Sequence, residues 1–362
     1  MSGEFLSLRS PTLELAHRVE RARAAGHSVL GVSTPAFPDR GLDTGARTLP
    51  VKLAPGRGDA GLREQLARSL FARWGAGGED LLVVSGAKAG LLVAVAALCR
   101  PGGTVALPTP CWPTYEAVAY SLGRRVKVCP CRSDQGWEFV ATEVLDGLQA
   151  GDMVALSNPN NPTGRVYSSA AIAALSERCA KSGVTLLLDE SFSETVDAGT
   201  TTTWGVCGER RGIVVLNSVS KNFLIQGWRI GALLAAPTVL EQLESVQTAL
   251  LSPPPAPMQL LLRDLLAAGT LTSPEFGETR RRTERRLTAI GCSVVPSGGT
   301  FYCYPRVPGL AAMRDDLERD AGLFMLAGAD FLHDELDFVR LSLLQPPGEL
   351  DHILERLAAC LQ

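Results

Sequence analysis

The sequence has few histidines, and its cysteines do not occur in metal-binding pairs. Its four histidines lie far apart in the chain, without the HExxH spacing of a metal-binding helix. Its nine cysteines include no CxxC pair, and most of them lie inside apolar runs. They are Cys99, Cys111, Cys129, Cys131, Cys179, Cys207, Cys292, Cys303 and Cys360. We therefore expect no metal site, and we expect reduced, buried thiols in a cytoplasmic protein.

Long apolar runs and a strong net charge are also missing. The first residues contain no apolar core of signal-peptide length and continue into a charged amphipathic segment, so we do not expect export. Apolar stretches such as residues 90–98 are too short to cross a bilayer. The net charge of the 362 residues is −3, and the arginines of residues 280–286 alternate with Thr and Glu, as on a solvated helix face. These features argue against a nucleic-acid or membrane partner.

Short apolar runs alternate with helical patterns from about residue 80 onward. The β-like runs are residues 81–84, 104–107, 125–129, 153–157, 185–189, 212–216 and 229–235. Helical patterns lie between them, at residues 87–99, 112–122 and 168–182. This alternation predicts a mostly parallel sheet of seven strands that is covered by helices.

The pattern changes beyond the proline-rich bend at residues 253–257. A long helical segment to about residue 289 is followed by β-like stretches at 293–296, 300–307 and 337–344, and then by a closing helix. We therefore predict an α/β protein with two domains. The large domain would be residues 46–265, and the smaller α+β domain would combine residues 266–362 with the N-terminal segment, residues 1–45.

One of the five lysines lies in a setting unlike the others. The segment SVSKNFLIQGWRIG, residues 218–231, follows a β-like run, so Lys221 would lie at the carboxyl edge of a parallel sheet, where such sheets bind ligands. Apolar surroundings disfavour the ammonium form of lysine, so the amine can attack a carbonyl and form an imine. Arg229 and the hydroxyls of Ser218 and Ser220 offer donors for a phosphate. Taken alone, a surface lysine beside a salt-bridging arginine would explain the same residues.

Two further motifs favour a binding site. The segment NPNNPTG, residues 158–164, predicts a fixed turn from which the Asn161 amide could donate to a cofactor ring oxygen. Asp189 ends an apolar run, where a buried carboxylate requires a cationic partner such as a protonated pyridine. The alternatives are an ordinary Asn-Pro loop for the first motif and a helix N-cap for Asp189.

Together these three stretches resemble the class I/II aminotransferases of fold type I, the aspartate aminotransferase-like family, and the resemblance covers nearly the whole chain. It implies pyridoxal 5′-phosphate, bound as a Schiff base to Lys221, which would also be the general base. Asp189 would then hold the pyridine nitrogen, and Asn161 would contact the ring oxygen. Ser218, Ser220 and Arg229 would bind the phosphate. The resemblance also implies a homodimer with its active sites near the subunit interface.

Weaker matches extend this map. Gly86, Ala87 and Lys88 would begin a helix whose N-terminus binds phosphate, although a plain helix cap explains them equally well. Trp112 takes the position of an aromatic that stacks on the cofactor, unless it is a core tryptophan. Arg340 would bind the substrate carboxylate, unless it is a strand-edge arginine that faces water. Ser33, in the stretch STPAF where the family more often has GEPDF, would contact the substrate.

The chain departs from the family pattern at two tyrosines. Phe192 replaces a tyrosine that donates to the ring oxygen, which should raise the pKa of the imine. Leu53 replaces a tyrosine that reaches the partner subunit's phosphate. These changes suggest a specialised biosynthetic role. We expect amino transfer between an α-amino acid and a 2-oxo acid. The alternatives are a lyase or cyclase that performs elimination, replacement or ring closure, as in capreomycidine synthase, and a regulator or catalytically idle binding protein.

Overall fold

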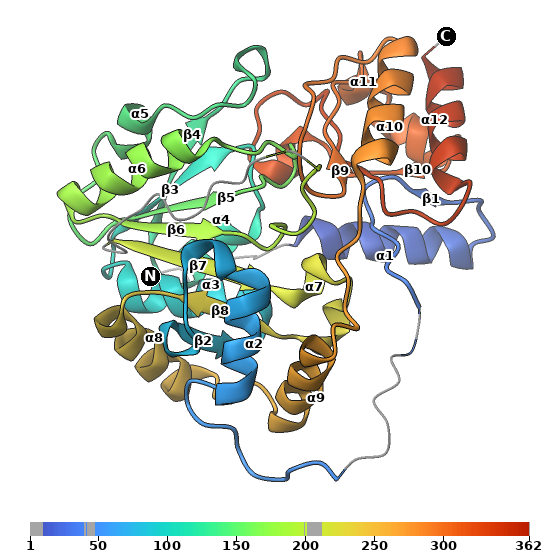
Figure 1. Ribbon diagram of the computed structural model, residues 1–362. Coiled ribbons are helices and arrows are strands. Elements are labelled where there is room, and N and C mark those ends of the chain that lie inside the picture. The colour runs from blue at the N-terminus through green and yellow to red at the C-terminus, as the bar shows by residue number, and fades with distance from the viewer. Residues whose placement is uncertain (1–9, 40, 42–47, 199, 201–211, 362) are drawn as a thin grey trace, which may run out of the picture.

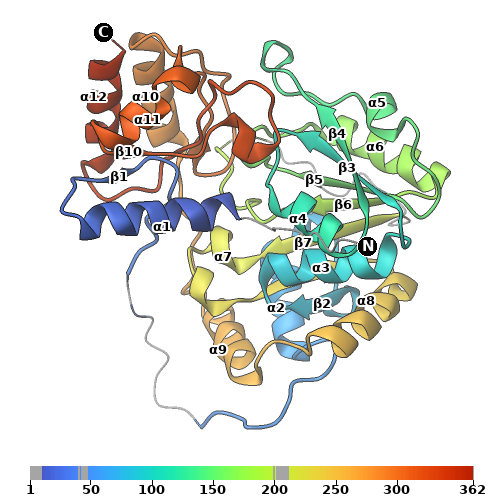
Figure 2. The ribbon, with the colours of Figure 1, turned by 180° about the vertical axis from the view of Figure 1, so that it is seen from behind.

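The computed structural model describes residues 10–39, 41, 48–198, 200 and 212–361. Figures 1 and 2 show the protein from opposite sides as a twisted sheet with helices on both faces and a smaller, mainly helical part beside it. The sheet has seven strands in the order β2-β8-β7-β6-β5-β3-β4, and only β8 runs antiparallel to its neighbours. The strands are β2 (Leu81–Val84), β3 (Thr104–Thr109), β4 (Arg125–Pro130), β5 (Met153–Ser157), β6 (Thr185–Asp189), β7 (Ile213–Ser218) and β8 (Gly231–Leu234). Each predicted β-like run before residue 253 forms one of them, so the predicted sheet is confirmed.

Successive side chains of the central strands enter two different cores, because strand residues point alternately to opposite faces. Leu187 and Leu216 pack on the face that is covered by α3, α4 and α8, which is the nearer face in Figure 2. Leu186 and Leu188 pack on the opposite face, against α2, α5, α6 and α9. The helices are α2 (Ala60–Leu70), α3 (Gly86–Leu98), α4 (Thr114–Ser121), α5 (Ala141–Leu145), α6 (Ser169–Ser182), α8 (Pro237–Leu250) and α9 (Ala256–Ala267).

The C-terminal part has its own core, which also includes Leu30 and Val32 from the N-terminal segment. A short parallel sheet of β1 and β10 joins the N-terminal segment to this part, and a second short sheet, in which β9 and β11 are antiparallel, lies within the C-terminal part itself. Figure 1 shows α1 lying along this part. The elements are α1 (Pro11–Ala24), β1 (Leu30–Gly31), α10 (Gly277–Ala289), β9 (Tyr302–Cys303), α11 (Leu310–Arg319), β10 (Leu323–Phe324), β11 (Leu341–Ser342) and α12 (Glu349–Cys360). None of the helices in the described ranges is long and apolar enough to cross a membrane.

Three details differ from the predictions. The long helical segment is two helices, α9 and α10, because Gly269 adopts a left-handed conformation (φ 64°) just after α9 and Pro274 lies in the interruption. The β-like stretch 293–296 forms only an isolated bridge from Ser293 to Arg306. Seven of the predicted buried cysteines are buried free thiols, but Cys360 is exposed, and Cys207 lies outside the described residues.

Candidate active site

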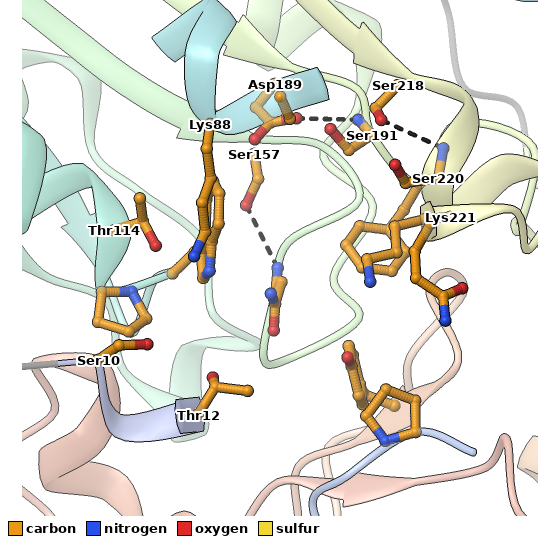
Figure 3. A pocket seen from close by; sticks show the side chains of 18 of the residues that line it. Ser10, Thr12, Lys88, Thr114, Ser157, Asp189, Ser191, Ser218, Ser220 and Lys221 are labelled. Atoms are coloured by element: carbon orange, nitrogen blue, oxygen red, sulfur yellow. Dashed lines mark hydrogen bonds between the residues drawn. The ribbon is translucent and has the colours of Figure 1, made fainter. Parts of the chain in front are cut away.

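A cavity of about 550 Å³ lies at the carboxyl ends of three parallel strands (Figure 3). The last residues of β5, β6 and β7, which are Ser157, Asp189 and Ser218, form part of its wall. Its other walls come from the N-terminal segment and from the C-terminal part. The cavity brings together ten of the residues predicted from the sequence: Ala87, Lys88, Trp112, Asn161, Asp189, Ser218, Ser220, Lys221, Arg229 and Arg340. Gly86 and Ser33 lie next to lining residues.

Lys221 lies in the short helix α7 (Val219–Asn222), directly after β7. Its Nζ is 4.3 Å from the centroid of the Phe37 ring, which belongs to the N-terminal segment. Burial, together with the positive charges of Arg340, Arg229 and Lys88, lowers the pKa of Lys221 to about 7. A large fraction of this amine is therefore neutral near pH 7, as a nucleophile or proton acceptor requires.

Asp189 ends β6 with its carboxylate facing the cavity. Its Oδ2 accepts a hydrogen bond of 2.7 Å from the Tyr115 hydroxyl, and its Oδ1 accepts one of 2.9 Å from the Ser191 N–H. Burial raises the pKa of Asp189, while these hydrogen bonds oppose the rise. A cation in the cavity would favour the ionised form further.

Several donors meet at the end of the cavity where α3 begins. Gly86 is the first residue of α3 and has a φ of 78°. A Cβ atom at this position would lie 2.5 Å from Arg229 Nη2, so glycine allows the guanidinium to approach the helix N-terminus. Arg229 Nη1 lies 3.4 Å from Ser220 Oγ, and Ser218 Oγ accepts a hydrogen bond of 3.2 Å from the Ser220 N–H. Such a cluster of donors suits a phosphate group.

Arg340 precedes β11 and joins three distant segments of the chain. Its Nη1 donates to Asn161 Oδ1, and its Nη2 donates to the Ser33 carbonyl oxygen, each over 3.1 Å. The Arg340 guanidinium stacks on the Tyr302 ring, 4.2 Å from its centroid. Ser33 differs from the expectation: its hydroxyl donates to the Arg340 carbonyl and accepts from the Leu326 N–H, so it supports Arg340 instead of facing the cavity.

The two aromatic residues singled out in the sequence both line the cavity but have different neighbours. Trp112 packs edge-on against Tyr115, with ring centroids 5.4 Å apart. Phe192 turns toward the C-terminal core, where its ring contacts Phe301 and Tyr302 at centroid distances of 5.2 and 5.9 Å. Phe192 therefore packs in the core, and its ring has no hydroxyl that could donate a hydrogen bond.

Sequence reasoning missed Tyr115, Ser191 and Tyr302, although all three line the cavity. Tyr115 lies three residues after Trp112, but no local pattern indicates that its hydroxyl reaches Asp189, which is 74 positions away. Tyr302 lies within the predicted β-like stretch 300–307, and the pattern there does not reveal its contact with Arg340.

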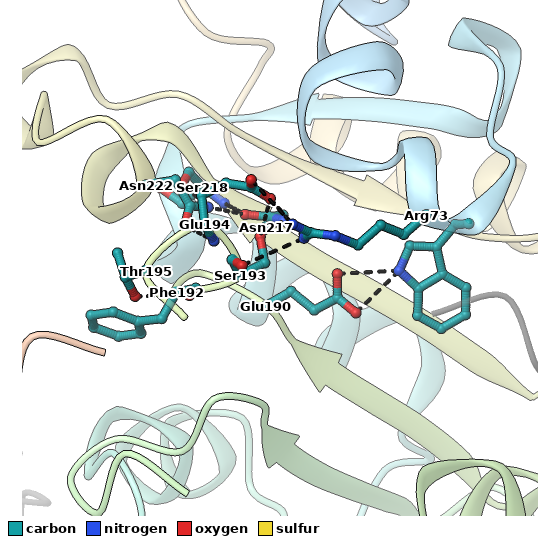
Figure 4. Close-up of polar contacts among 10 residues, drawn as sticks. Arg73, Glu190, Phe192, Ser193, Glu194, Thr195, Asn217, Ser218 and Asn222 are labelled. Atoms are coloured by element: carbon teal, nitrogen blue, oxygen red, sulfur yellow. Dashed lines mark hydrogen bonds and ion pairs between the residues drawn. The ribbon is translucent and has the colours of Figure 1, made fainter. Parts of the chain in front are cut away.

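A second polar cluster, which the sequence did not indicate, surrounds Glu190 and Glu194, next to the cavity-lining Ser218 (Figure 4). Both carboxylate oxygens of Glu190 lie 3.1 Å from the Trp74 indole nitrogen, and Arg73 pairs with Glu194 at 2.7 Å. The Asn222 amide donates to Asn217 Oδ1 over 2.7 Å and to the Ser218 carbonyl over 3.1 Å. This cluster therefore holds α7, which carries Lys221, against β7.

The site and fold have counterparts in known proteins. Residues 43–357 match the family model for aminotransferases of class I and II. The chain is 30% identical to the arginine–pyruvate transaminase of Pseudomonas aeruginosa (84% of this chain, 81% of that protein) and 29% identical to the valine–pyruvate aminotransferase of Mycobacterium tuberculosis (83% and 81%). The solved structure of aspartate aminotransferase from Thermotoga maritima superposes with a TM-score of 0.85 at 26% identity, covering 98% of this chain and 97% of that one.

The named activities of these relatives favour amino transfer over elimination, replacement or ring closure. The resemblance seen in the sequence is thereby confirmed, and so is fold type I. The chain therefore belongs to the class I and II aminotransferases, a family of enzymes that use pyridoxal phosphate.

Proposed function

We propose that this enzyme transfers an amino group between an α-amino acid and a 2-oxo acid, with pyridoxal 5′-phosphate bound at Lys221. One observation carries the proposal. Lys221, a lysine with a pKa of about 7, and the buried carboxylate of Asp189 face the same cavity, at the ends of neighbouring parallel strands. A reactive amine beside a carboxylate that pairs with no cation in the described part of the chain is the arrangement that a pyridine aldehyde requires.

The other lining groups match the remaining parts of pyridoxal phosphate. Gly86, Ala87 and Lys88 at the start of α3, together with Ser218, Ser220 and Arg229, would hold the phosphate. Asp189 would keep the ring nitrogen protonated, and Asn161 would donate from its amide to the ring oxygen. Trp112 would pack on the ring. The close approach of Arg229 to Gly86 supports this assignment, because it leaves the guanidinium and the helix N-terminus side by side.

When bound, pyridoxal phosphate supplies an electron sink for the negative charge that develops at the substrate α-carbon. Arg340 would bind the α-carboxylate in bidentate fashion and would thereby fix the α-carbon above Lys221. The neutral Nζ of Lys221 would accept the α-proton, hold it and return it. Tyr115 would keep the Asp189 carboxylate in orientation by its hydrogen bond.

The test is reduction with borohydride in the presence of pyridoxal phosphate, followed by peptide mapping and by turnover assays with a panel of amino acids and 2-oxo acids. We expect the label on Lys221, and we expect Lys221→Ala to lower turnover by about 10⁴-fold, because the general base is lost. Lys181→Ala is the matched control, since Lys181 is an exposed lysine that pairs with Glu177. An unlabelled Lys221, or full turnover by Lys221→Ala, would refute the proposal.

The assembly, location, domain limits and pathway belong to the same proposal. We propose a homodimer, supported by the exposed apolar side chains of Leu49, Val51 and Leu53.

Free thiols at the described cysteines agree with a cytoplasmic location. We propose residues 46–265 and residues 1–45 with 266–362 as the two domains. The replacement of family tyrosines by Phe192 and Leu53 supports a specialised biosynthetic role. Analytical ultracentrifugation tests the dimer, which a monomer at micromolar concentration would contradict.

A further inference from the structure

Ser191 carries a hydroxyl that the described part of the chain leaves without a hydrogen bond. The residue is 7% exposed and lies two positions after Asp189, in the turn that follows β6. No hydrogen bond of normal geometry joins its Oγ to a described residue, although the side chain is near enough to Asp189 to oppose the rise in its pKa. A buried hydroxyl without a partner is destabilising, because it has lost its bonds to water.

The surroundings of Ser191 show where a partner could come from. Ser191 lines the cavity, and Figure 3 shows it beside Asp189 on the wall that also carries Ser218 and Lys221. Its own N–H is already engaged with Asp189 Oδ1. The next residue, Phe192, has no hydroxyl to offer to a bound molecule. Ser191 is therefore the only hydroxyl among residues 190–192, and it lies at the cavity.

We propose that Ser191 is a further cofactor-binding residue, whose hydroxyl donates a hydrogen bond to an oxygen of bound pyridoxal phosphate. This inference rests on the proposed function. The acceptor is anionic in either form that the cofactor offers, a ring oxygen or a phosphate oxygen, and hydrogen bonds to charged acceptors are the stronger ones. Loading the cofactor thus satisfies a group that the empty protein buries at a cost.

The consequence is a pair of opposite effects in one variant. In Ser191→Ala the cofactor-free protein loses a hydroxyl that makes no hydrogen bond of normal geometry, so its melting temperature stays the same or rises. The same variant binds pyridoxal phosphate more weakly, by roughly tenfold in dissociation constant, because the loaded protein loses a hydrogen bond. A serine with a purely structural role would produce neither this combination nor this sign.

The experiment compares wild type, Ser191→Ala and Ser193→Ala by thermal unfolding without cofactor and by titration with pyridoxal phosphate. Ser193 is the matched control: it is fully buried, its hydroxyl donates to Glu194 Oε1 over 3.2 Å and accepts from the Asn217 amide over 3.1 Å, and it does not line the cavity. Ser193→Ala should lower the melting temperature and leave the dissociation constant within about twofold of wild type.

Titration with pyridoxal, which lacks the phosphate, identifies the acceptor. Weaker binding of both compounds by Ser191→Ala supports a ring oxygen, and weaker binding of the phosphorylated compound alone supports a phosphate oxygen. An unchanged dissociation constant, or a lower melting temperature of the cofactor-free variant, overturns the inference. If wild type itself fails to bind pyridoxal phosphate, the proposed function fails first, and the two failures are thus distinguishable.

Discussion

Asp189 and Glu190 are adjacent carboxylates that face opposite sides of the same sheet edge. They are almost equally buried, at 4% and 1% exposure, and burial raises the pKa of both. Asp189 has a cavity in front of it, whereas Glu190 points back into the cluster around Trp74 (Figure 4). Burial alone therefore does not mark a functional carboxylate.

The difference lies in what can reach each group. The Glu190 oxygens accept hydrogen bonds from the Trp74 indole N–H, which tertiary packing holds in place. Protonation of Glu190 therefore affects the stability of the fold and not the binding of a ligand. The Asp189 oxygens are held by Tyr115 and the Ser191 backbone, and the carboxylate still borders space large enough for a ring. We therefore expect substitutions at the cavity-lining Asp189 and Tyr115 to alter activity. Substitutions at Glu190 and Trp74, which face away from the cavity, should alter stability.

The largest expected effect is on turnover when the front carboxylate is neutralised. Asp189→Asn should lower kcat by roughly 100- to 1000-fold. The variant would lose the ion pair that we propose between Asp189 and the protonated ring nitrogen of the cofactor, which is worth up to about 4 kcal/mol at an effective dielectric near 20. Glu190→Gln should keep kcat within about threefold of wild type, because Glu190 does not face the cavity. Steady-state kinetics of both variants, saturated with cofactor, measure the contrast. Equal losses in the two variants would abolish the distinction.

The next effect is on the stability of the protein when the contact between Trp74 and Glu190 is removed. Trp74→Phe should reduce the free energy of unfolding by about 1–3 kcal/mol, because Glu190 is left buried without its donor. Urea unfolding of the cofactor-free protein measures the loss. The double variant Trp74→Phe with Glu190→Leu is the control, and it should recover part of the stability because the unsatisfied carboxyl is gone. A double variant that recovers no stability would show that the loss in Trp74→Phe does not come from the unsatisfied carboxyl.

A smaller effect is expected for the donor in front. Tyr115→Phe should lower kcat by about tenfold while KM changes little, because the Asp189 carboxylate loses one hydrogen bond and its orientation. Tyr120→Phe, on the same helix with an exposed ring, is the matched control and should match wild type. A large rise in KM with unchanged kcat would place Tyr115 in substrate binding instead.

The last expected effect is a dependence of stability on pH. Because the pKa of Glu190 is raised on folding, the folded protein holds a proton that the unfolded chain releases above its ordinary pKa of 4.5. This contribution is complete below that pH and declines as the pH rises toward the folded pKa. The stability of wild type relative to Glu190→Gln should thus fall between pH 5 and 7, by at most about 1.4 kcal/mol per pH unit. Parallel stability curves would show that Glu190 does not titrate in this range.

Sequence patterns predicted the strands and the sheet because each depends on local information. Together with the family resemblance, they also named ten of the residues that line the cavity. A run such as residues 185–189 is apolar throughout, and the position of Asp189 at its end follows from the run itself. The bond between Tyr115 and Asp189 and the bond between Trp74 and Glu190 join residues 74 and 116 positions apart, so they depend on how layers pack. The orientation of Ser33 likewise depends on its neighbours Leu326 and Arg340, which no local pattern specifies.

The junction at Arg340 makes the start of the chain indispensable to the site. The Ser33 carbonyl and the Asn161 amide oxygen, which hold the guanidinium, lie 307 and 179 positions from Arg340. Among the described residues up to position 30, only Ser10 and Thr12 bring polar side chains to the cavity, yet the segment that follows them positions the arginine at the far end of the chain. Shortening the protein from its N-terminus as far as Ser33 would therefore disturb the Arg340 guanidinium, which we propose binds the substrate carboxylate, although Lys221 and Asp189 would remain.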